Sequence, residues 1–428
     1  PTGSRQRFRT VSYSRLATGL LVAWITWAAV GTASGSIERA AGLARLLSAR
    51  EPVLRVGVRV GVPSIEIGSV SGLLLSDAQT GYSIGAVGPG ETLRISREGS
   101  GLSSSGDQLR GAGIVHVLRV EASGEEPVTI DGSPYRGRFE LLAVEDSLVT
   151  AVNILPLEEY LRGVVPLEIG PRTREELAAI EAQAVAARTY AVSHLDGHEE
   201  MGFDLFGTVE DQVYGGIDAE RQESNEAVRA TAGRILTYDG LPIRAYYHST
   251  CGGRTAAIDE VIDRPSAPYL RSVSDRAPDG SDWCSISPRY RWSSSWSGDE
   301  LNGPVRDELA RMFGERPQAL GPIDGFRVTG HTESGRVHSV AFYGPGAQFV
   351  LERLDIRFAL RDPDGRILGS TDFDVVPDAD GVYEVHGRGF GHGAGMCQWG
   401  AIARARAGQT SEEILSTYYP GTRLSRVY

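Results

Sequence analysis

The sequence predicts an α+β protein in which a β-rich N-terminal part precedes mixed helices and antiparallel β segments. Apolar residues alternate with others in PVLRVGVRVGV, residues 52–62, which is the two-residue period of a strand. A long alanine-rich helix is predicted over residues 173–195, and short helices and strands alternate after it. The 428 residues, with 41% hydrophobic and 23% charged, suffice for two or three soluble domains.

The first 36 residues have the order of an export signal. Arginines at positions 5, 7, 9 and 15 precede an uncharged apolar run over 16–30, and small residues follow over 31–36. The order predicts a secretory signal cleaved after Ala33, and the same stretch is long enough for an uncleaved membrane anchor. Residues 37–52 are predicted to be a linker with a short helix.

The region from residue 53 to about 150 is predicted to be β-rich. Further strand-like runs are GLLLSD, TLRIS, GIVHVLRVEA and RFELLAVEDSLVTAVNIL, and glycine- and serine-rich turns separate them. The following helix begins with a capping-box pattern at Thr173 and Glu176. Later elements are a helix at 220–232, a hairpin around Asp239 and Gly240, a helix at 299–315, strands and turns over 322–385, and a helix at 411–421.

The net charge and the cysteine count restrict the function classes. A formal net charge of -12 argues against a nucleic-acid partner. Three cysteines are too few for a disulfide-built fold, so one bridge and one free thiol are expected in an exported protein. Cys251 and Cys284 are the candidate disulfide pair, and three unpaired thiols are the alternative.

Glu168 is the first candidate for chemistry. It lies in GVVPLEIG, residues 163–170, which we interpret as an apolar, proline-punctuated turn before the long helix. An apolar wall raises the pKa of a carboxyl group and prepares it to act as a general acid. The alternative is a charge that complements the N-terminal end of the helix.

Arg188 is the second candidate. Its neighbours on the predicted helix, Ala187 and Thr189, are small, so its guanidinium could reach past them to a carboxylate or a sugar hydroxyl. An ordinary ion pair with a nearby glutamate is the alternative.

Two further segments combine aromatic and hydrogen-bonding groups that suit sugar rings. They are YYHSTCGGRT, residues 246–255, and the glycine-rich GRGFGHGAGMCQWG, residues 387–400. The alternative is that their aromatics are ordinary core residues. The candidate substrate-binding residues are Tyr247, His248, Ser249, His392, Gln398 and Trp399.

Other site chemistries find little support. The sequence has no G-x-S-x-G elbow and no lysine followed by serine or threonine after the glycine-rich loop. His248 and Cys251 are three residues apart, but no second pair at zinc spacing follows. No metal and no cofactor are therefore predicted.

Seven segments together resemble the SpoIID/LytB family. In order, they are VNILPLEEYLRGVVPLEIG, EAQAVAARTYAV, QVYGG, AYYHSTCGGRT, PYLRSVSD, GRGFGHGAGMCQWGA and YYPGT. The resemblance covers residues 135–428 and leaves residues 53–134 as a separate β-rich N-terminal region. The family contains stage II sporulation protein D, a peptidoglycan lytic transglycosylase, and the amidase enhancer LytB.

The resemblance implies an exported cell-wall enzyme, located in the periplasm or envelope, with Glu168 as its acid and base and Arg188 in the same cleft. The implied reaction cleaves the bond between N-acetylmuramic acid and N-acetylglucosamine and leaves a 1,6-anhydro end. The implied partners are glycan strands, with or without stem peptides, and a cell-wall amidase; a membrane would be contacted only through the N-terminal segment. A non-catalytic peptidoglycan-binding amidase enhancer is the alternative.

One departure from the family concerns metal. Some members carry a zinc-binding Cys/His cluster just before Q-V-Y, whereas FDLFGTVEDQVYGG, residues 203–216, contains neither residue type. The resemblance therefore does not imply a metal at that position. Glu158 and Glu159, which precede Glu168, are expected to be solvent-facing charges.

Overall fold

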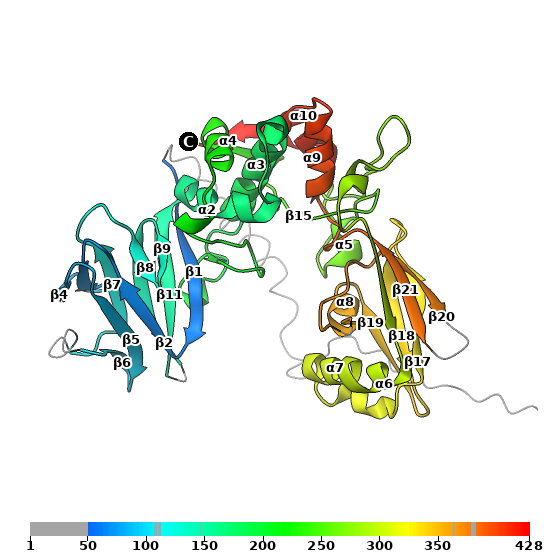
Figure 1. Cartoon of the computed structure of the whole chain (residues 1–428), viewed down its shortest axis with the longest axis horizontal. Helices are drawn as coiled ribbons and strands as arrows, with labels where there is room; N and C mark the ends of the chain where they lie inside the picture. The colour runs from blue at the N-terminus through cyan, green and yellow to red at the C-terminus, as the bar shows by residue number, and fades with distance from the viewer. Residues whose placement is uncertain (1–49, 107–108, 110–112, 146, 363, 378–381) are drawn as a thin grey trace, which may run out of the picture. The chain divides into compact units, whose positions relative to one another are not determined.

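The chain has an α+β fold that divides into two compact units (Figure 1). The structure is a computed structural model that describes residues 50–428, except 107–108, 110–112, 146, 363 and 378–381. Of the described residues, 50–245 and 423–428 form the N-terminal unit, and 246–422 form the C-terminal unit. The predicted export signal and most of the predicted linker lie outside the described residues. Among the helices that the structure describes, none is both long and apolar enough to cross a membrane.

Among the described residues, the N-terminal unit contains three β-sheets: a seven-stranded one, a five-stranded one and the three-stranded sheet β14-β13-β23. In the largest sheet, of order β12-β1-β11-β10-β7-β3-β4, β1 and β12 are parallel and the other pairs are antiparallel. Strands from both sides of residue 135 share this sheet, so the structure draws no division there. Its strands are β1 (Val53–Val62), β3 (Leu73–Asp77), β4 (Ser83–Val87), β7 (Val117–Ala122), β10 (Arg138–Val144), β11 (Leu148–Pro156) and β12 (Leu205–Phe206).

The five-stranded sheet is antiparallel, in the order β6-β5-β2-β8-β9. In the seven-stranded sheet, the predicted alternation of β1 is confirmed, because its residues Leu54, Val56 and Val58 are buried. The strands of this second sheet are β2 (Ser64–Gly68), β5 (Thr92–Glu98), β6 (Gly101–Ser104), β8 (Val128–Ile130) and β9 (Ser133–Tyr135).

Three helices pack against one another at the end of these sheets (Figure 1). They are α2 (Leu157–Ile169), α3 (Leu177–Ser193) and α4 (Gln222–Ala230). The alanines of α3 are buried along its length, which confirms the close packing that they predict. The capping box also forms, since the Thr173 N–H donates to the Glu176 carboxylate at 3.0 Å. A short 3₁₀ helix, η2 (Arg174–Glu176), occupies that first turn, so α3 begins later than predicted.

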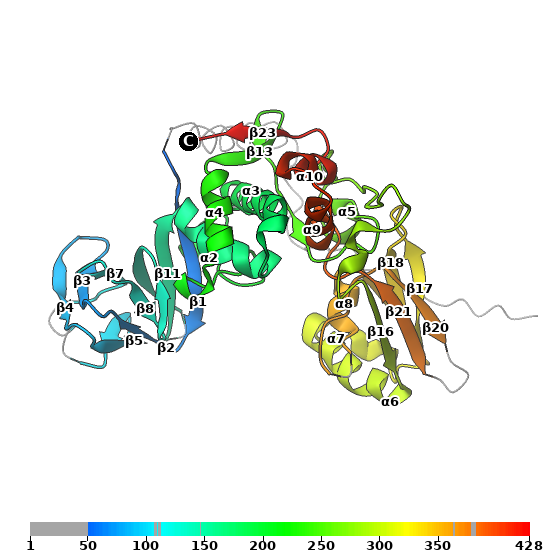
Figure 2. The ribbon, with the colours of Figure 1, turned by 45° about the horizontal axis from the view of Figure 1, so that its top comes forward.

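The last residues of the chain return to the N-terminal unit. β23 (Arg423–Arg426) pairs antiparallel with β13 (Arg234–Tyr238), and the two lie side by side in Figure 2. The predicted hairpin at Asp239 and Gly240 joins β13 to β14 (Leu241–Pro242). Smaller 3₁₀ helices of this unit are η3 (Glu199–Met201) and η4 (Ile217–Ala219).

In the part that the structure describes, the C-terminal unit has two three-stranded antiparallel sheets and a two-stranded parallel pair. The sheets are β16-β21-β20 and β17-β18-β19, with a core that includes Trp296, Phe326 and Phe342. The strands are β15 (Tyr247–His248), β16 (Arg291–Trp296), β17 (Gly325–His331), β18 (Val337–Tyr343), β19 (Gln348–Glu352), β20 (Phe373–Pro377), β21 (Tyr383–Arg388) and β22 (Met396–Cys397).

Short helices complete the C-terminal unit, and the predicted helices at 299–315 and 411–421 are confirmed. The first is split into α6, a π-helical turn η6 and α7, with Pro304 inside the π turn. The helices are α5 (Ile258–Val261), η5 (Trp283–Ile286), α6 (Gly298–Glu300), η6 (Leu301–Val305), α7 (Arg306–Phe313), η7 (Arg316–Leu320), α8 (Asp355–Ala359), α9 (Gln398–Arg406) and α10 (Ser411–Tyr418).

Candidate active site

Glu168 lies in the last turn of α2, so the predicted turn is wrong. The buried positions Leu157, Leu161, Val164 and Val165 follow the helical period and bring this segment into a helix. Pro166 is accommodated within α2, and Gly170, at a φ of 77°, ends it. Glu168 is therefore at the C-terminal end of a helix, not in front of the N-terminal end of the next one.

Glu168 is partly exposed, and its carboxylate is held by the backbone of the QVYGG segment, residues 212–216. The Val213 N–H donates to Glu168 Oε1 at 3.0 Å. The Leu167 side chain beside it is 45% exposed. Tyr160, two turns earlier on α2, is fully buried, and burial together with the nearby Glu168 charge raises the pKa of the Tyr160 hydroxyl well above its ordinary value.

The QVYGG segment is tied to α2 and to the sheet by several hydrogen bonds. The Gly215 N–H donates to the Gly163 carbonyl at 3.1 Å, and the Tyr214 hydroxyl donates to Asn153 Oδ1 at 3.0 Å. Gln212 is fully buried and donates to the Ala187 carbonyl at 3.3 Å. These contacts fix the Val213 N–H, and with it the orientation of the Glu168 carboxylate.

Arg188 is 0% exposed and forms a two-point ion pair with Glu158, the second residue of α2. Its Nε and Nη2 donate to the two Glu158 oxygens at 2.8 and 2.7 Å. Its remaining hydrogens reach the Thr231 hydroxyl at 3.3 Å and the carbonyls of Arg234 and Val228, both at 3.2 Å. The guanidinium has no solvent-exposed surface and is bonded to Glu158 at the start of α2, the helix that ends near Glu168. A direct catalytic role for Arg188 stays a prediction.

The expectation that Glu158 faces solvent is wrong. Its side chain is 17% exposed, and it also accepts hydrogen bonds from the Tyr428 hydroxyl and the Gly233 N–H. Burial opposes ionisation of Glu158, but Arg188 and these donors outweigh burial and lower its pKa below the ordinary 4.5. Sequence reasoning missed this residue because its partners are 30, 75 and 270 positions away.

The six predicted substrate-binding residues lie in the C-terminal unit, where the structure gathers them around the β15–β22 pair. Tyr247 and His248 pair with Met396 and Cys397, and the Trp399 N–H donates to the Ser249 carbonyl at 3.0 Å. Tyr247, Ser249, His392 and Trp399 are partly exposed, whereas His248 and Gln398 are buried. Glu168 and Arg188 belong to the N-terminal unit.

The hydrogen bonds of His392 define its tautomer. Its Nε2 donates to the Tyr247 carbonyl at 2.8 Å, and its Nδ1 accepts from the Ala394 N–H at 3.1 Å. Burial and the charges of Arg357 and Arg336 lower the pKa of His392 to about 4. His248 donates from Nδ1 to the Ala394 carbonyl at 3.1 Å, and burial lowers its pKa well below the usual value. Both imidazoles are thus neutral hydrogen-bonding groups at neutral pH.

The predicted Cys251–Cys284 disulfide is not formed in this structure. All three cysteines are buried free thiols, and the sulfurs of Cys251 and Cys284 are 3.5 Å apart, longer than a disulfide bond of about 2.05 Å. The pairing does identify true neighbours. Cys397 joins them, since the Cys251 N–H donates to its sulfur at 3.2 Å.

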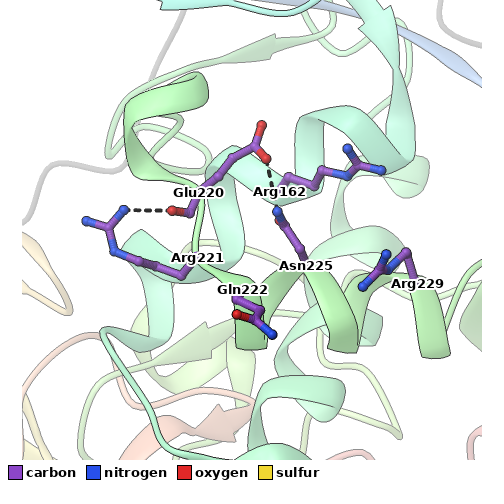
Figure 3. Close-up of a pocket in the computed structure, with 6 residues that line it drawn as sticks. All are labelled: Arg162, Glu220, Arg221, Gln222, Asn225 and Arg229. Carbon is purple, nitrogen blue, oxygen red and sulfur yellow. Dashed lines mark hydrogen bonds between the residues drawn. The ribbon is translucent and has the colours of Figure 1, made fainter.

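A pocket of about 330 Å³ lies elsewhere on the N-terminal unit, and Glu168 is not among its lining residues (Figure 3). Within it, Asn225 donates to the Glu220 carboxylate at 3.0 Å, and Arg221 donates to the Glu220 backbone carbonyl at 2.6 Å. Arg162, Gln222 and Arg229 complete its lining. The predicted acid and this arginine-rich pocket are therefore separate features of the unit.

Two protein families match parts of the chain. A profile described as "Stage II sporulation protein" matches residues 145–238, which include both Glu168 and Arg188. A second profile, described as a domain of unknown function (DUF8618), matches residues 279–395.

Relatives match over longer stretches. An uncharacterized protein of Brachyspira hyodysenteriae is 30% identical over 298 residues, which cover 69% of this chain and 74% of that protein. Stage II sporulation protein D of Bacillus subtilis is 31% identical over 64% of this chain and 76% of its own length. The amidase enhancer of Bacillus subtilis is 30% identical over 62% of this chain, but only 40% of that longer protein is covered. The chain therefore belongs to the stage II sporulation protein D (SpoIID) family.

Proposed function

We propose that this protein is an exported cell-wall enzyme, a lytic transglycosylase that cleaves peptidoglycan glycan strands. The observation that carries the proposal is the position of Glu168, which is partly exposed at the end of α2 and whose carboxylate is oriented by the Val213 N–H at 3.0 Å. The family match over residues 145–238 and the relatives named for stage II sporulation protein D support it.

Glu168 acts first as an acid in the proposed reaction. It protonates the oxygen that links C1 of N-acetylmuramic acid to N-acetylglucosamine, and the C1–O bond breaks with the electron pair on that oxygen. The 6-hydroxyl of the same muramoyl residue attacks C1, and its proton returns to Glu168. The product is a 1,6-anhydro end, and the carboxyl group is regenerated. Because the nucleophile belongs to the sugar, no second carboxylate is needed to activate water, in contrast to the paired-carboxylate hydrolases.

Arg188 has a positioning role in this proposal. The ion pair with Glu158 anchors the first turn of α2, and Glu168 is in the last turn of the same helix. A helix transmits this constraint because its backbone is internally hydrogen-bonded. The partly exposed Tyr247, Ser249 and Trp399 are proposed to contact sugar rings through aromatic faces and hydroxyl groups.

A second candidate function is that of a non-catalytic, peptidoglycan-binding amidase enhancer. The observation in its favour is the similarity to the amidase enhancer of Bacillus subtilis. Under this proposal the partner is a cell-wall amidase.

The test is product analysis with purified protein on intact and on peptide-free glycan strands. Mass spectrometry of the wild-type digest is expected to show 1,6-anhydromuramoyl ends, and the Glu168→Gln variant is expected to release about 10²–10⁴-fold less, the usual contribution of a general acid. Wild-type protein that binds glycan without releasing anhydro ends would contradict the enzyme proposal. Stimulation of an added amidase by that protein would then support the enhancer.

A further inference from the structure

Three cysteines and an aspartate meet inside the C-terminal unit, and neither the proposed reaction nor the sugar contacts use them. The cysteine–aspartate cluster consists of Cys251, Asp275, Cys284 and Cys397, each 0% exposed. One ligand atom from each residue can be chosen such that all four lie within 4.8 Å of one another. From this geometry we propose that the cluster binds one zinc ion.

Two distances within the cysteine–aspartate cluster are close to those around a single tetrahedral ion. Zinc bonds of about 2.3 Å to sulfur and 2.0 Å to oxygen place tetrahedral sulfurs roughly 3.8 Å apart and sulfur and oxygen roughly 3.5 Å apart. The sulfurs of Cys251 and Cys284 are 3.5 Å apart, and Cys251 Sγ is 3.2 Å from Asp275 Oδ2. Small adjustments of side chains would admit the ion, and thiolate-rich tetrahedral sites favour zinc.

Asp275 is held as an oriented metal ligand is. Its Oδ1 accepts from the Tyr418 hydroxyl at 2.7 Å and from Arg404 Nη2 at 3.1 Å, while Oδ2 faces the Cys251 sulfur. Hydrogen bonds to the outer oxygen of a ligand carboxylate fix its direction in metal sites. Arg404 also supplies a positive charge that partly balances three thiolates and a carboxylate around a dication.

Backbone N–H groups point at the sulfurs of this cluster. The Gly253 N–H reaches Cys251 Sγ at 3.4 Å, and Cys397 Sγ accepts from the N–H groups of Cys251 at 3.2 Å and Gly400 at 3.4 Å. Such donors stabilise negative charge on sulfur, which suits a thiolate ligand. A Cys251–Cys284 disulfide would not account for the burial of Cys397 and of Asp275 Oδ2 beside the same sulfur.

The proposed site is structural rather than catalytic. Four protein ligands complete a tetrahedron, and their full burial leaves no open position for water or substrate. Through its four ligands the ion would link four segments: the segment after β15 at Cys251, the loop at Asp275, η5 at Cys284 and the start of α9 at Cys397. It would thus tie four segments together close to Ser249, Gln398 and Trp399. The inference does not depend on the proposed transglycosylase activity.

The test uses the full chain, purified after growth with zinc and without strong chelators. Elemental analysis is expected to find about one zinc per chain. Replacement by Co²⁺ is expected to give a near-ultraviolet thiolate-to-cobalt charge-transfer band and the intense visible bands of a tetrahedral ion. Readdition of zinc to stripped protein is expected to raise the melting temperature by roughly 10 °C at a thousand-fold excess over the dissociation constant.

Two variants and a matched control assign the ligands. Cys284→Ser is expected to lose the bound metal, and Asp275→Asn is expected to weaken metal binding and shift the cobalt bands while keeping three thiols. Asp279→Asn, a change of the same kind in an exposed loop, is expected to retain one zinc. An unchanged cobalt spectrum in Asp275→Asn would overturn the four-ligand site.

Two results with the wild-type chain would overturn the site altogether. One is metal-free exported protein that has lost the mass of two hydrogens through a Cys251–Cys284 bond. The other is reduced protein with three alkylatable thiols that takes up neither zinc nor cobalt. Neither measurement requires a variant to fold.

Discussion

The two ends of α2 carry glutamates of opposite character. Glu158, in the first turn, is largely buried, and both of its carboxylate oxygens accept hydrogen bonds from Arg188. The Tyr428 hydroxyl and the Gly233 N–H are further donors. Glu168, in the last turn, is partly exposed and is oriented by a backbone N–H of the QVYGG segment. One helix thus joins a carboxylate that is paired within the fold to a carboxylate that we propose for catalysis.

The largest expected effect on stability is at the Glu158 end. Glu158→Gln removes the counter-charge of a guanidinium that is 0% exposed, so we expect a loss of about 3–5 kcal/mol in the free energy of unfolding. Denaturant unfolding monitored by circular dichroism measures this loss. The double variant Glu158→Leu/Arg188→Met is expected to recover much of it, because no buried charge is left unpaired.

Arg188→Met alone separates a positioning role from a catalytic one. If Arg188 acts through α2, glycan cleavage and the melting temperature fall together in this variant. Loss of cleavage with unchanged melting would contradict the positioning role and support direct contact with substrate.

A smaller expected effect comes from Gly163→Ala, near the middle of α2. A Cβ at Gly163 would lie 2.5 Å from a ring carbon of Tyr214 and 2.9 Å from the Gly216 carbonyl oxygen. Alanine normally gains about 1 kcal/mol over glycine in a helix, but overpacking costs about 1–3 kcal/mol, so a net loss of about 1 kcal/mol is expected. Because the added methyl contacts the QVYGG segment, which orients Glu168, the rate of glycan cleavage is expected to fall even though most of the folding stability is kept.

Gly298→Ala is the matched control for Gly163→Ala. Its new methyl lies in open space within helix α6. Gly99→Ala would not serve, because Gly99 has a φ of 61° and a side chain there would be strained. We expect Gly298→Ala to keep both cleavage and stability. Full cleavage by Gly163→Ala, measured as release of anhydro ends, would show that the contact between α2 and QVYGG does not position Glu168.

The pH dependence of stability tests the ion pair of Glu158. The pKa of Glu158 is lower in the folded chain than its ordinary 4.5, so its contribution to stability is present above pH 4.5 and is lost as the pH falls through the folded value. Wild-type protein should therefore lose more stability than Glu158→Gln on acidification through this range. Parallel curves for the two proteins would argue against the ion pair.

The smallest expected effect is at Glu159, adjacent to Glu158. Its partly exposed carboxylate forms ion pairs with Arg136 at 3.1 Å and Arg162 at 3.4 Å. Glu159→Gln is expected to change the free energy of unfolding by less than about 1 kcal/mol and to leave cleavage unchanged. A large effect on cleavage would mean that the first turn of α2 takes part in substrate binding.

The sequence predicts much of the fold because local patterns determine local elements. The alternation in β1, the capping box before α3 and the turn at Asp239 and Gly240 are all confirmed. The same reasoning fails at Glu168, where two prolines suggest a turn. The helical spacing of Leu157, Leu161, Val164 and Val165 is the signal that identifies α2 correctly.

Contacts between distant residues could not be predicted in this way. Nothing local marks Glu158 as the partner of Arg188, because the two meet only when α2 and α3 pack. The cysteine–aspartate cluster is a similar case. Zinc sites are recognised in sequences by pairs of ligands a few residues apart, whereas these four ligands come from segments separated by 9 to 146 positions along the chain.

The central claim is that Glu168 does chemistry and is not needed for the fold. Its most direct test measures anhydro-end release and the melting temperature of Glu168→Gln beside those of the wild type. We predict a loss of about 10²–10⁴-fold in release, with the melting temperature unchanged. Release at the wild-type rate by a folded Glu168→Gln protein would contradict the account.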